Sequence, residues 1–252
     1  MPRSKKNKNK QKYPQDVNRE QRKYRLRPLQ PKNQPQQSYL DALYEAKITF
    51  GLGPAGTGKT FVASYVACEK LLSGEIDKIV ITRPIVEAGE KLGFLPGDLD
   101  AKIHPYLLPL LDAFEHFIGP KLTKEFLESG KIEVAPLAFM RGRTLTNAFC
   151  ILDESQNTTI DQMKMFLTRI GSGTTYAING DASQSDLEEQ SYKPIENGLS
   201  WAVRKLRGKT SKIYVNEFRK ADVVRHPLIG EMLTHLEAPD EFPEKKTQTL
   251  ME

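Results

Sequence analysis

The sequence contains little that could form a disulfide framework, a metal cluster or a membrane span. Only two of its 252 residues are cysteines, and the segments around Cys68 and Cys150 are apolar, so we expect both thiols to be buried. No apolar run reaches the roughly 18 residues of a membrane helix, and no apolar segment follows the first basic residues as in a secretory signal. The four histidines lack the spacing of metal ligands. These absences predict a cytoplasmic protein that makes no membrane contact.

The net charge of +5 is unevenly distributed along the chain. Residues 1–35 contain twelve lysines or arginines and two acidic residues, whereas the remainder is mildly acidic. Because residues 1–34 have few apolar side chains to bury, we expect a disordered basic tail. It is either a solubilising arm or an electrostatic tether for nucleic acid. One folded domain over residues 35–237 and a flexible C-terminal tail over residues 238–252 complete the predicted organisation.

The segment between these tails alternates short β-rich runs with longer runs of helical periodicity. The β-rich runs cover residues 48–50, 79–82, 132–134, 148–152, 175–178 and 213–215. The helical runs cover residues 59–72, 106–117, 122–127, 160–170, 196–206 and 227–236. Such alternation is typical of βα crossover units, and a near-continuous apolar strand is typical of a sheet buried on both faces. The pattern predicts an α/β fold of three layers, αβα, with a mostly parallel central sheet.

The strongest motif is Gly-Pro-Ala-Gly-Thr-Gly-Lys-Thr, between the first predicted strand and the first predicted helix. It matches the phosphate-binding loop, in which glycines let backbone N–H groups surround phosphate oxygens at a helix N-terminus. We expect Lys59 to contact the β- and γ-phosphates and Thr60 to bind Mg²⁺ through its hydroxyl. The predicted nucleotide-binding residues are Gly53, Pro54, Ala55, Gly56, Thr57, Gly58, Lys59 and Thr60.

A second motif follows the predicted strand 148–152, which leads into Asp153 and Glu154. An Asp at the end of an apolar strand is the expected partner of a P-loop, where it holds Mg²⁺. Glu154 would then lie beside the γ-phosphate and would orient and deprotonate a water molecule. Because a kinase needs its acceptor substrate at that place, the pair favours hydrolysis over phosphoryl transfer.

Polar residues also follow the predicted strand 175–178, in the string Asn-Gly-Asp-Ala-Ser-Gln. Parallel α/β sheets gather ligand-binding groups at the carboxyl ends of their strands. Gln184 is therefore a candidate to hydrogen-bond the γ-phosphate or the attacking water, and a polar turn is the alternative. Two further segments either hold a nucleic-acid backbone or are structural: the loop that contains Arg83 and Lys91, and residues 141–144.

Several longer strings occur in one order along the chain. Besides the motifs above, they are Thr-Arg-Pro at 82–84, Glu-Ala-Gly-Glu-Lys-Leu-Gly-Phe-Leu-Pro-Gly-Asp at 87–98, Met-Arg-Gly-Arg-Thr at 140–144, Gln-Met-Lys-Met-Phe-Leu-Thr-Arg-Ile-Gly at 162–171 and Asp-Val-Val-Arg-His-Pro at 222–227. Over about residues 36–232 the chain thereby resembles the PhoH family, P-loop ATPases related to superfamily-one RNA helicases.

The resemblance implies a RecA-like core, ATP and Mg²⁺ as cofactors, and action on RNA, which we expect to be single-stranded. It implies that Gln36 or Gln37 contacts the adenine edge and that Arg225 contacts the γ-phosphate. A monomeric translocase alternates two such cores, and this chain supplies one. We therefore expect Arg225, or Arg219 nearby, to act on a neighbouring subunit's site in a homo-oligomer, with a hexamer as first candidate. Arg225 acting within its own chain, or pairing with Asp222, is the alternative.

Three functional hypotheses follow from these features. The first is an ATPase that remodels or unwinds RNA, with turnover that RNA stimulates. The second is a non-motor nucleotide switch or RNA-binding module, with slow hydrolysis and no strand displacement. The third is a small-molecule kinase, against which Glu154 and the lack of an arginine-rich lid both weigh.

Overall fold

The computed structural model describes residues 25–84, 111–182, 184 and 196–224. Six strands in these residues form one sheet in the order β3-β2-β4-β5-β1-β6, and every neighbouring pair is parallel. All six lie where the sequence predicts strands, so the predicted parallel sheet is confirmed. The strands are β1 (Ile48–Leu52), β2 (Lys78–Arg83), β3 (Ile132–Pro136), β4 (Ala148–Leu152), β5 (Thr175–Gly180) and β6 (Ile213–Glu217).

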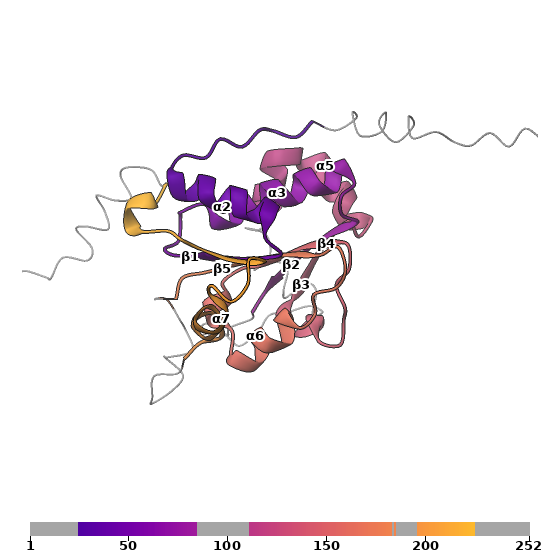
Figure 1. Cartoon of the computed structure of the whole chain (residues 1–252). Coiled ribbons are helices and arrows are strands. Elements are labelled where there is room, and N and C mark those ends of the chain that lie inside the picture. Colours follow the sequence, from indigo (N-terminus) through magenta and orange to yellow (C-terminus); the bar gives the residue numbers. More distant parts are fainter. Residues whose placement is uncertain (1–24, 85–110, 183, 185–195, 225–252) are drawn as a thin grey trace, which may run out of the picture.

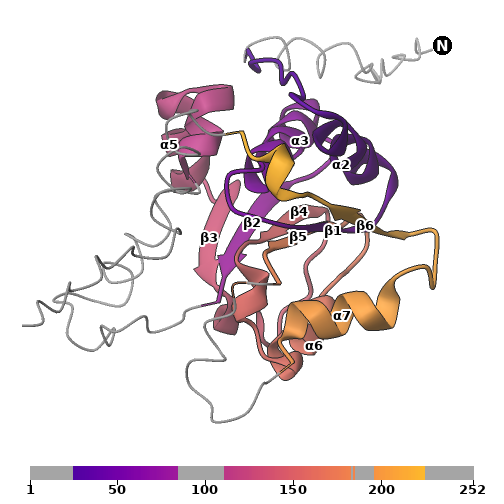
Figure 2. The same cartoon turned by 90° about the vertical axis from the view of Figure 1, so that its left-hand side faces the viewer.

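Helices cover both faces of this sheet (Figure 1). One layer contains α2 (Gln34–Glu45), α3 (Lys59–Ser73) and α5 (Pro120–Glu128), and the other contains α6 (Ile160–Leu167) and α7 (Gly198–Leu206). Residues 111–118 are also helical, and short 3₁₀ turns occur at η3 (Leu137–Met140), η4 (Ser155–Asn157) and η5 (Lys220–Asp222). Figure 2 shows the strands edge to edge between the two layers. Each helix in this described part is too short or too polar to cross a bilayer.

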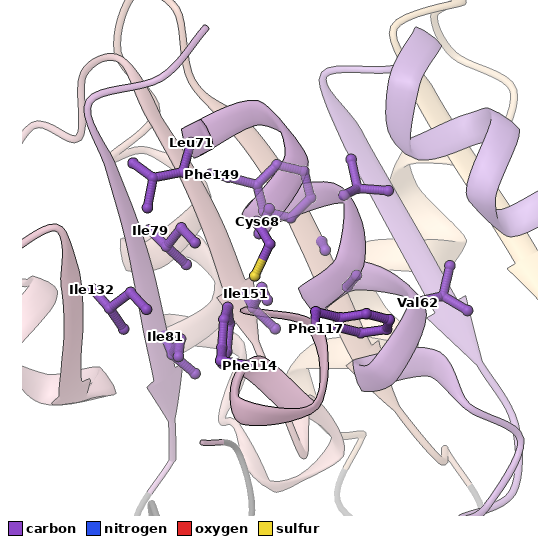
Figure 3. Close-up of a cluster of buried hydrophobic side chains, with 14 of the residues drawn as sticks. Val62, Cys68, Leu71, Ile79, Ile81, Phe114, Phe117, Ile132, Phe149 and Ile151 are labelled. Carbon is purple, nitrogen blue, oxygen red and sulfur yellow. The ribbon is translucent and has the colours of Figure 1, made fainter. Parts of the chain in front are cut away.

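The two faces of the sheet bury two separate apolar clusters. In β4, Phe149 and Ile151 belong to the cluster beneath α3, whereas Cys150 and Leu152 belong to the cluster against α6 and α7. Figure 3 shows the first cluster, in which Cys68 of α3 points toward the strands. Because side chains alternate between the faces of a strand, a strand covered on both faces must be apolar throughout. Both cysteines are buried and free, as predicted.

The sequence analysis does not predict α2. The apolar face of this helix is narrow, since its buried residues are Gln36, Tyr39, Ala42 and Leu43. The signal that marks its start is Asn33, whose side chain accepts a hydrogen bond from the Gln36 N–H, followed by a proline in the first turn. A capping argument would have found this helix where hydrophobic periodicity alone does not.

The folded body begins earlier than the predicted boundary at residue 35. Leu26 and Leu29 pack against the first core cluster, and the Arg27 N–H donates to the Phe117 carbonyl oxygen at 2.9 Å. Residues 25–34 therefore belong to the body and not to a disordered tail, because these leucines find an apolar surface that local composition does not reveal. The rest of the predicted basic tail, the predicted helix 227–236 and the predicted C-terminal tail lie outside the described residues.

Candidate nucleotide-binding site

A cavity of about 230 Å³ lies where the carboxyl ends of β1, β4 and β5 meet. These three strands are neighbours in the sheet although they are far apart in the sequence. The turn after β4 contributes Asp153 and Glu154, and the end of β5 and the turn after it contribute Gly180, Asp181 and Gln184. The loop after β1 and the first turn of α3 contribute Ala55, Gly56, Gly58, Lys59, Thr60 and Phe61. The sheet therefore brings together the three groups that the sequence places at separate strand ends.

The loop between β1 and α3 requires glycine for steric reasons. Gly53 has φ 132° and Gly58 has φ 85°, a region that favours glycine. A Cβ atom on Gly53 would lie 2.3 Å from the Phe218 carbonyl oxygen, and one on Gly58 would lie 2.8 Å from Gln36 Nε2. Because α3 begins at Lys59, its N-terminus and the N–H groups of its first turn lie beside the cavity. This is the arrangement that binds phosphate groups.

Lys59 is buried at the wall of the cavity. Its Nζ donates to the carbonyl oxygens of Gly53, at 2.5 Å, and Pro54, at 2.9 Å. Burial lowers the pKa of Lys59, and the carboxylates of Asp153 and two neighbouring acidic residues act in the opposite direction. A phosphate in the cavity would compete with the loop carbonyls for this ammonium group.

Thr60 and Asp153 meet across the cavity. Thr60 Oγ1 donates to Asp153 Oδ1 at 2.8 Å. Burial raises the pKa of Asp153, Glu154 raises it further, and the hydrogen bond from Thr60 opposes the shift. One carboxylate and one hydroxyl oxygen on two separate elements fit Mg²⁺, which binds proteins through few carboxylates and keeps its other positions for water and phosphate. The donor set therefore fits the predicted metal.

Glu154 lies at a sharp turn from β4 into η4. Its backbone is left-handed, with φ 50°, a conformation that costs about 1–2 kcal/mol for a residue with a side chain. Gln156 Nε2 donates to Glu154 Oε2 at 2.7 Å, and Arg83 Nη2 lies 3.5 Å from Glu154 Oε1. Arg83 thus faces the site from the end of β2, while Lys91 of the same predicted loop lies outside the described residues.

Gln184 reaches the cavity by a turn after β5. Its N–H donates to the Asp181 carbonyl oxygen at 3.0 Å, and the residue lines the cavity. This position is compatible with a contact to the γ-phosphate or to water. The contact itself stays a prediction.

Gln36 lies against the P-loop from the side of α2. Its Nε2 donates to the Thr57 carbonyl oxygen at 2.9 Å, and its Oε1 accepts from the Lys32 N–H at 2.8 Å. The residue is only 5% exposed and is not among the described residues that line the cavity. In this conformation Gln36 holds the P-loop through its hydrogen bond to Thr57. For its side-chain amide to bind adenine, the hydrogen bonds to Thr57 and Lys32 would have to be replaced by hydrogen bonds to the base.

Arg225 lies outside the described residues. The chain just before it is tied to the P-loop, because the Val224 N–H donates to the Gly56 carbonyl oxygen at 2.9 Å. Asn33 Nδ2 donates to the Asp222 carbonyl oxygen at 3.2 Å, so η5 is also held by the start of α2. The segment after β6 therefore closes one side of the P-loop within the same chain.

The two arginines of residues 141–144 have different environments. Both terminal nitrogens of Arg143 donate hydrogen bonds to the Glu133 carboxylate, and Nη2 lies 2.8 Å from Oε2. Arg141 is exposed beside Phe139, which is 48% exposed. Arg143 therefore has a structural role. Of these two arginines, Arg141 stays the candidate for a nucleic-acid contact.

We expect Arg143→Ala to lower the free energy of unfolding by about 1 kcal/mol at pH 7, since the pair is bidentate but partly exposed. The hydrogen bonds from Arg143 lower the pKa of Glu133 below its ordinary 4.5. The stabilisation is therefore complete above that ordinary pKa and is lost as the pH falls through the lowered one. Urea unfolding at several pH values checks this, with Arg141→Ala as the control. A difference in stability that does not shrink in acid would contradict the pairing.

Sequence comparisons agree with the motifs. The profile of a protein family described as PhoH-like protein matches residues 28–237. The chain is 50% identical over 205 residues to a PhoH-like protein of Bacillus subtilis, covering 81% of this chain and 63% of that protein. It is 50% identical over 198 residues to one of Synechocystis, covering 79% and 59%. It is 41% identical over 208 residues to Protein PhoH of Escherichia coli K12, covering 82% and 57%. The chain thus spans about 60% of the length of these relatives.

Two solved structures align with the chain at low TM-scores. The HK97 bacteriophage large terminase aligns with a TM-score of 0.44 at 13% identity, covering 92% of this chain and 49% of that one. The Pif1 helicase of Candida albicans aligns with a TM-score of 0.36 at 13% identity, covering 84% and 46%.

Proposed function

This chain belongs to the PhoH-like protein family, and on that premise we propose that it binds and hydrolyses ATP with Mg²⁺, coupled to the binding or remodelling of single-stranded RNA. The observation that carries the ATPase proposal is the hydrogen bond between Thr60 and Asp153, with Glu154 lining the same cavity. A P-loop alone indicates only nucleotide binding. A carboxylate next to the metal-binding pair adds a group that can activate water.

Each group at the cavity has a separate task in the proposed reaction. The N–H groups at the start of α3 and the Lys59 ammonium would hold the β- and γ-phosphates. Thr60 and Asp153 would hold Mg²⁺, and the bound ion would neutralise part of the negative charge of the phosphates. Glu154 would accept a proton from the attacking water at a carboxylate oxygen, and Gln184 would hydrogen-bond the same water or the γ-phosphate.

One observation favours the second candidate, a non-motor switch with slow hydrolysis. Both carboxylate oxygens of Glu154 have a donor within the chain, since Gln156 lies at 2.7 Å and Arg83 at 3.5 Å. A base held in this way would accept a proton poorly until one donor moves. Arg83 is about one-third exposed, so the phosphate backbone of RNA could draw it away.

Turnover measured with single-stranded RNA, single-stranded DNA, duplexes and no nucleic acid separates the two candidates. The ATPase proposal predicts hydrolysis that single-stranded RNA stimulates. The switch predicts slow hydrolysis with no strand displacement. ATP binding without any turnover under all four conditions would reject the ATPase proposal.

Deletion of residues 1–24 is expected to weaken nucleic-acid binding and to flatten its dependence on salt, while basal ATP hydrolysis stays intact. This segment contains nine lysines or arginines and two acidic residues, and binding by counterion release weakens steeply as salt rises. Fluorescence anisotropy with labelled RNA at several salt concentrations measures the slope. The deletion stops at residue 24 because Leu26 and Leu29 pack on the core. Unchanged affinity at low salt would leave the segment only a solubilising role.

The predicted ring stays a proposal. Its argument is that one RecA-like core needs an arginine to neutralise the transition state, a contribution of about 10³–10⁵ in rate. Arg225 and the exposed Arg219 are its candidates. The tie between Val224 and Gly56 supports the alternative, in which Arg225 serves its own chain. The predicted cytoplasmic location likewise stays a prediction.

A further inference from the structure

Gln156 is buried, at 3% exposure, between two residues that line the cavity, Glu154 and Asp181. Its Nε2 donates to Glu154 Oε2 at 2.7 Å. Its Oε1 accepts from the Asp181 N–H at 3.1 Å. One amide group therefore joins the side chain that follows β4 to the backbone that follows β5, and the sequence analysis did not single it out.

The orientation of this amide is set by its partners. A carboxylate only accepts hydrogen bonds and a backbone N–H only donates, so the NH₂ group must face Glu154 and the oxygen must face Asp181. The amide also lies close to the backbone of β5. A Cβ atom on Gly180 would lie 2.7 Å from Gln156 Oε1 and 2.8 Å from Ser155 Oγ, which shows how closely η4 approaches that strand.

The Glu154 carboxylate needs such a restraint. Glu154 itself has a left-handed backbone and its side chain is 38% exposed, and an exposed glutamate samples several rotamers. A general base contributes fully only when it is held within hydrogen-bonding distance of the proton that it removes. Of the two donors that the described residues place on this carboxylate, Arg83 is more distant at 3.5 Å, whereas Gln156 is close, at 2.7 Å, and buried.

Resting on the proposed ATPase function, we propose that Gln156 is a positioning residue that aims the Glu154 carboxylate at the attacking water and ties it to the backbone of Asp181. It acts through Glu154 and does not contact the substrate. Asp181 lies in the turn that also contains Gln184, the predicted contact of the γ-phosphate. The Gln156 side chain therefore connects Glu154 to that turn. A shift of that turn on nucleotide binding would be transmitted to the base.

Two substitutions separate positioning of Glu154 from support of the Asp181 turn. Gln156→Leu removes both hydrogen bonds. Gln156→Glu keeps the shape and the acceptor for the Asp181 N–H but replaces the donor with a like charge. We expect kcat to fall about tenfold to a hundredfold in both, the usual range for partners that orient a reacting group, with affinity for an ATP analogue within about threefold. The matched control is Gln162→Leu in α6, which removes the capping hydrogen bond that the Thr159 N–H donates to Gln162 Oε1.

A double-mutant cycle with Glu154→Gln completes the test. If Gln156 acts through Glu154, Gln156→Leu causes no further fall in kcat once Glu154 has been replaced. Full activity in Gln156→Glu, or effects that multiply in the double variant, would overturn the inference while wild-type turnover upholds the ATPase. A wild-type chain that binds ATP without hydrolysing it would instead overturn the proposed function and this inference with it.

Discussion

Glu154→Gln is expected to lower kcat for ATP hydrolysis about a thousandfold, within the range of about 10²–10⁴ that a general base contributes. The amide keeps the size of the side chain but cannot accept a proton from water. Affinity for ATP should stay equal or rise, because a negative charge beside the γ-phosphate is removed. Single-turnover hydrolysis together with calorimetric ATP binding measures the two effects separately.

The structure indicates that Glu154→Gln changes the stability of the fold little. The ion pair that it removes, with Arg83 at 3.5 Å, is partly exposed, and such pairs contribute about 0–1 kcal/mol to stability. We therefore expect an unfolding temperature close to that of the unsubstituted chain. Glu128→Gln, on the exposed face of α5, is the matched control and should keep full turnover. Turnover in Glu154→Gln within a few-fold of the original would show that another group activates the water.

Lys59→Ala is expected to weaken ATP binding about a hundredfold or more. The lysine would make charge-assisted hydrogen bonds to two phosphates, and hydrogen bonds to charged groups contribute about 1.5–3 kcal/mol each. A ligand that binds only the folded state raises the unfolding temperature. Magnesium and a slowly hydrolysed ATP analogue should therefore raise that temperature for the original chain and leave it unchanged for Lys59→Ala.

Without nucleotide, Lys59→Ala should fold with nearly unchanged stability. The ammonium hydrogen-bonds the carbonyl oxygens of Gly53 and Pro54, but its burial lowers the pKa of Lys59, so the charge itself is costly there. These two contributions oppose one another. Lys124→Ala, on the exposed face of α5, should behave like the original chain in both assays. An undiminished thermal response in Lys59→Ala would mean that nucleotide binds elsewhere.

The sheet was predictable because its strands have a strong local signal. Residues 148–152 are all apolar, so both faces of this strand are apolar. Each predicted strand is followed closely by a turn residue or a charged residue. A parallel sheet places all its carboxyl ends at one edge, so Lys59, Asp153 and Gln184 could be assigned to one site before their distances were known. The strand order, which makes β1, β4 and β5 neighbours, could not be read from the sequence.

The start of the domain was predicted less well, for an energetic reason. Leu26 and Leu29 are two apolar residues among charged and polar ones, and local composition predicts disorder for such a segment. Their packing on the first core cluster depends on helices far along the chain. The helix α2 was missed because its buried side includes the polar Gln36, whose side chain finds hydrogen-bond partners in the P-loop and in the backbone before the helix.

The sequence by itself determined the class of fold and named the groups of the candidate site, since strand alternation and the P-loop spacing are local patterns. Only the tertiary structure distinguished Arg143, bonded to Glu133, from the exposed Arg141. It alone brought Gln156 between Glu154 and Asp181. The physical reason is that the role of a polar side chain depends on the partner it meets, and partners on other strands, such as Glu133 on β3 for Arg143 and Asp181 after β5 for Gln156, are brought near only by the order of the strands.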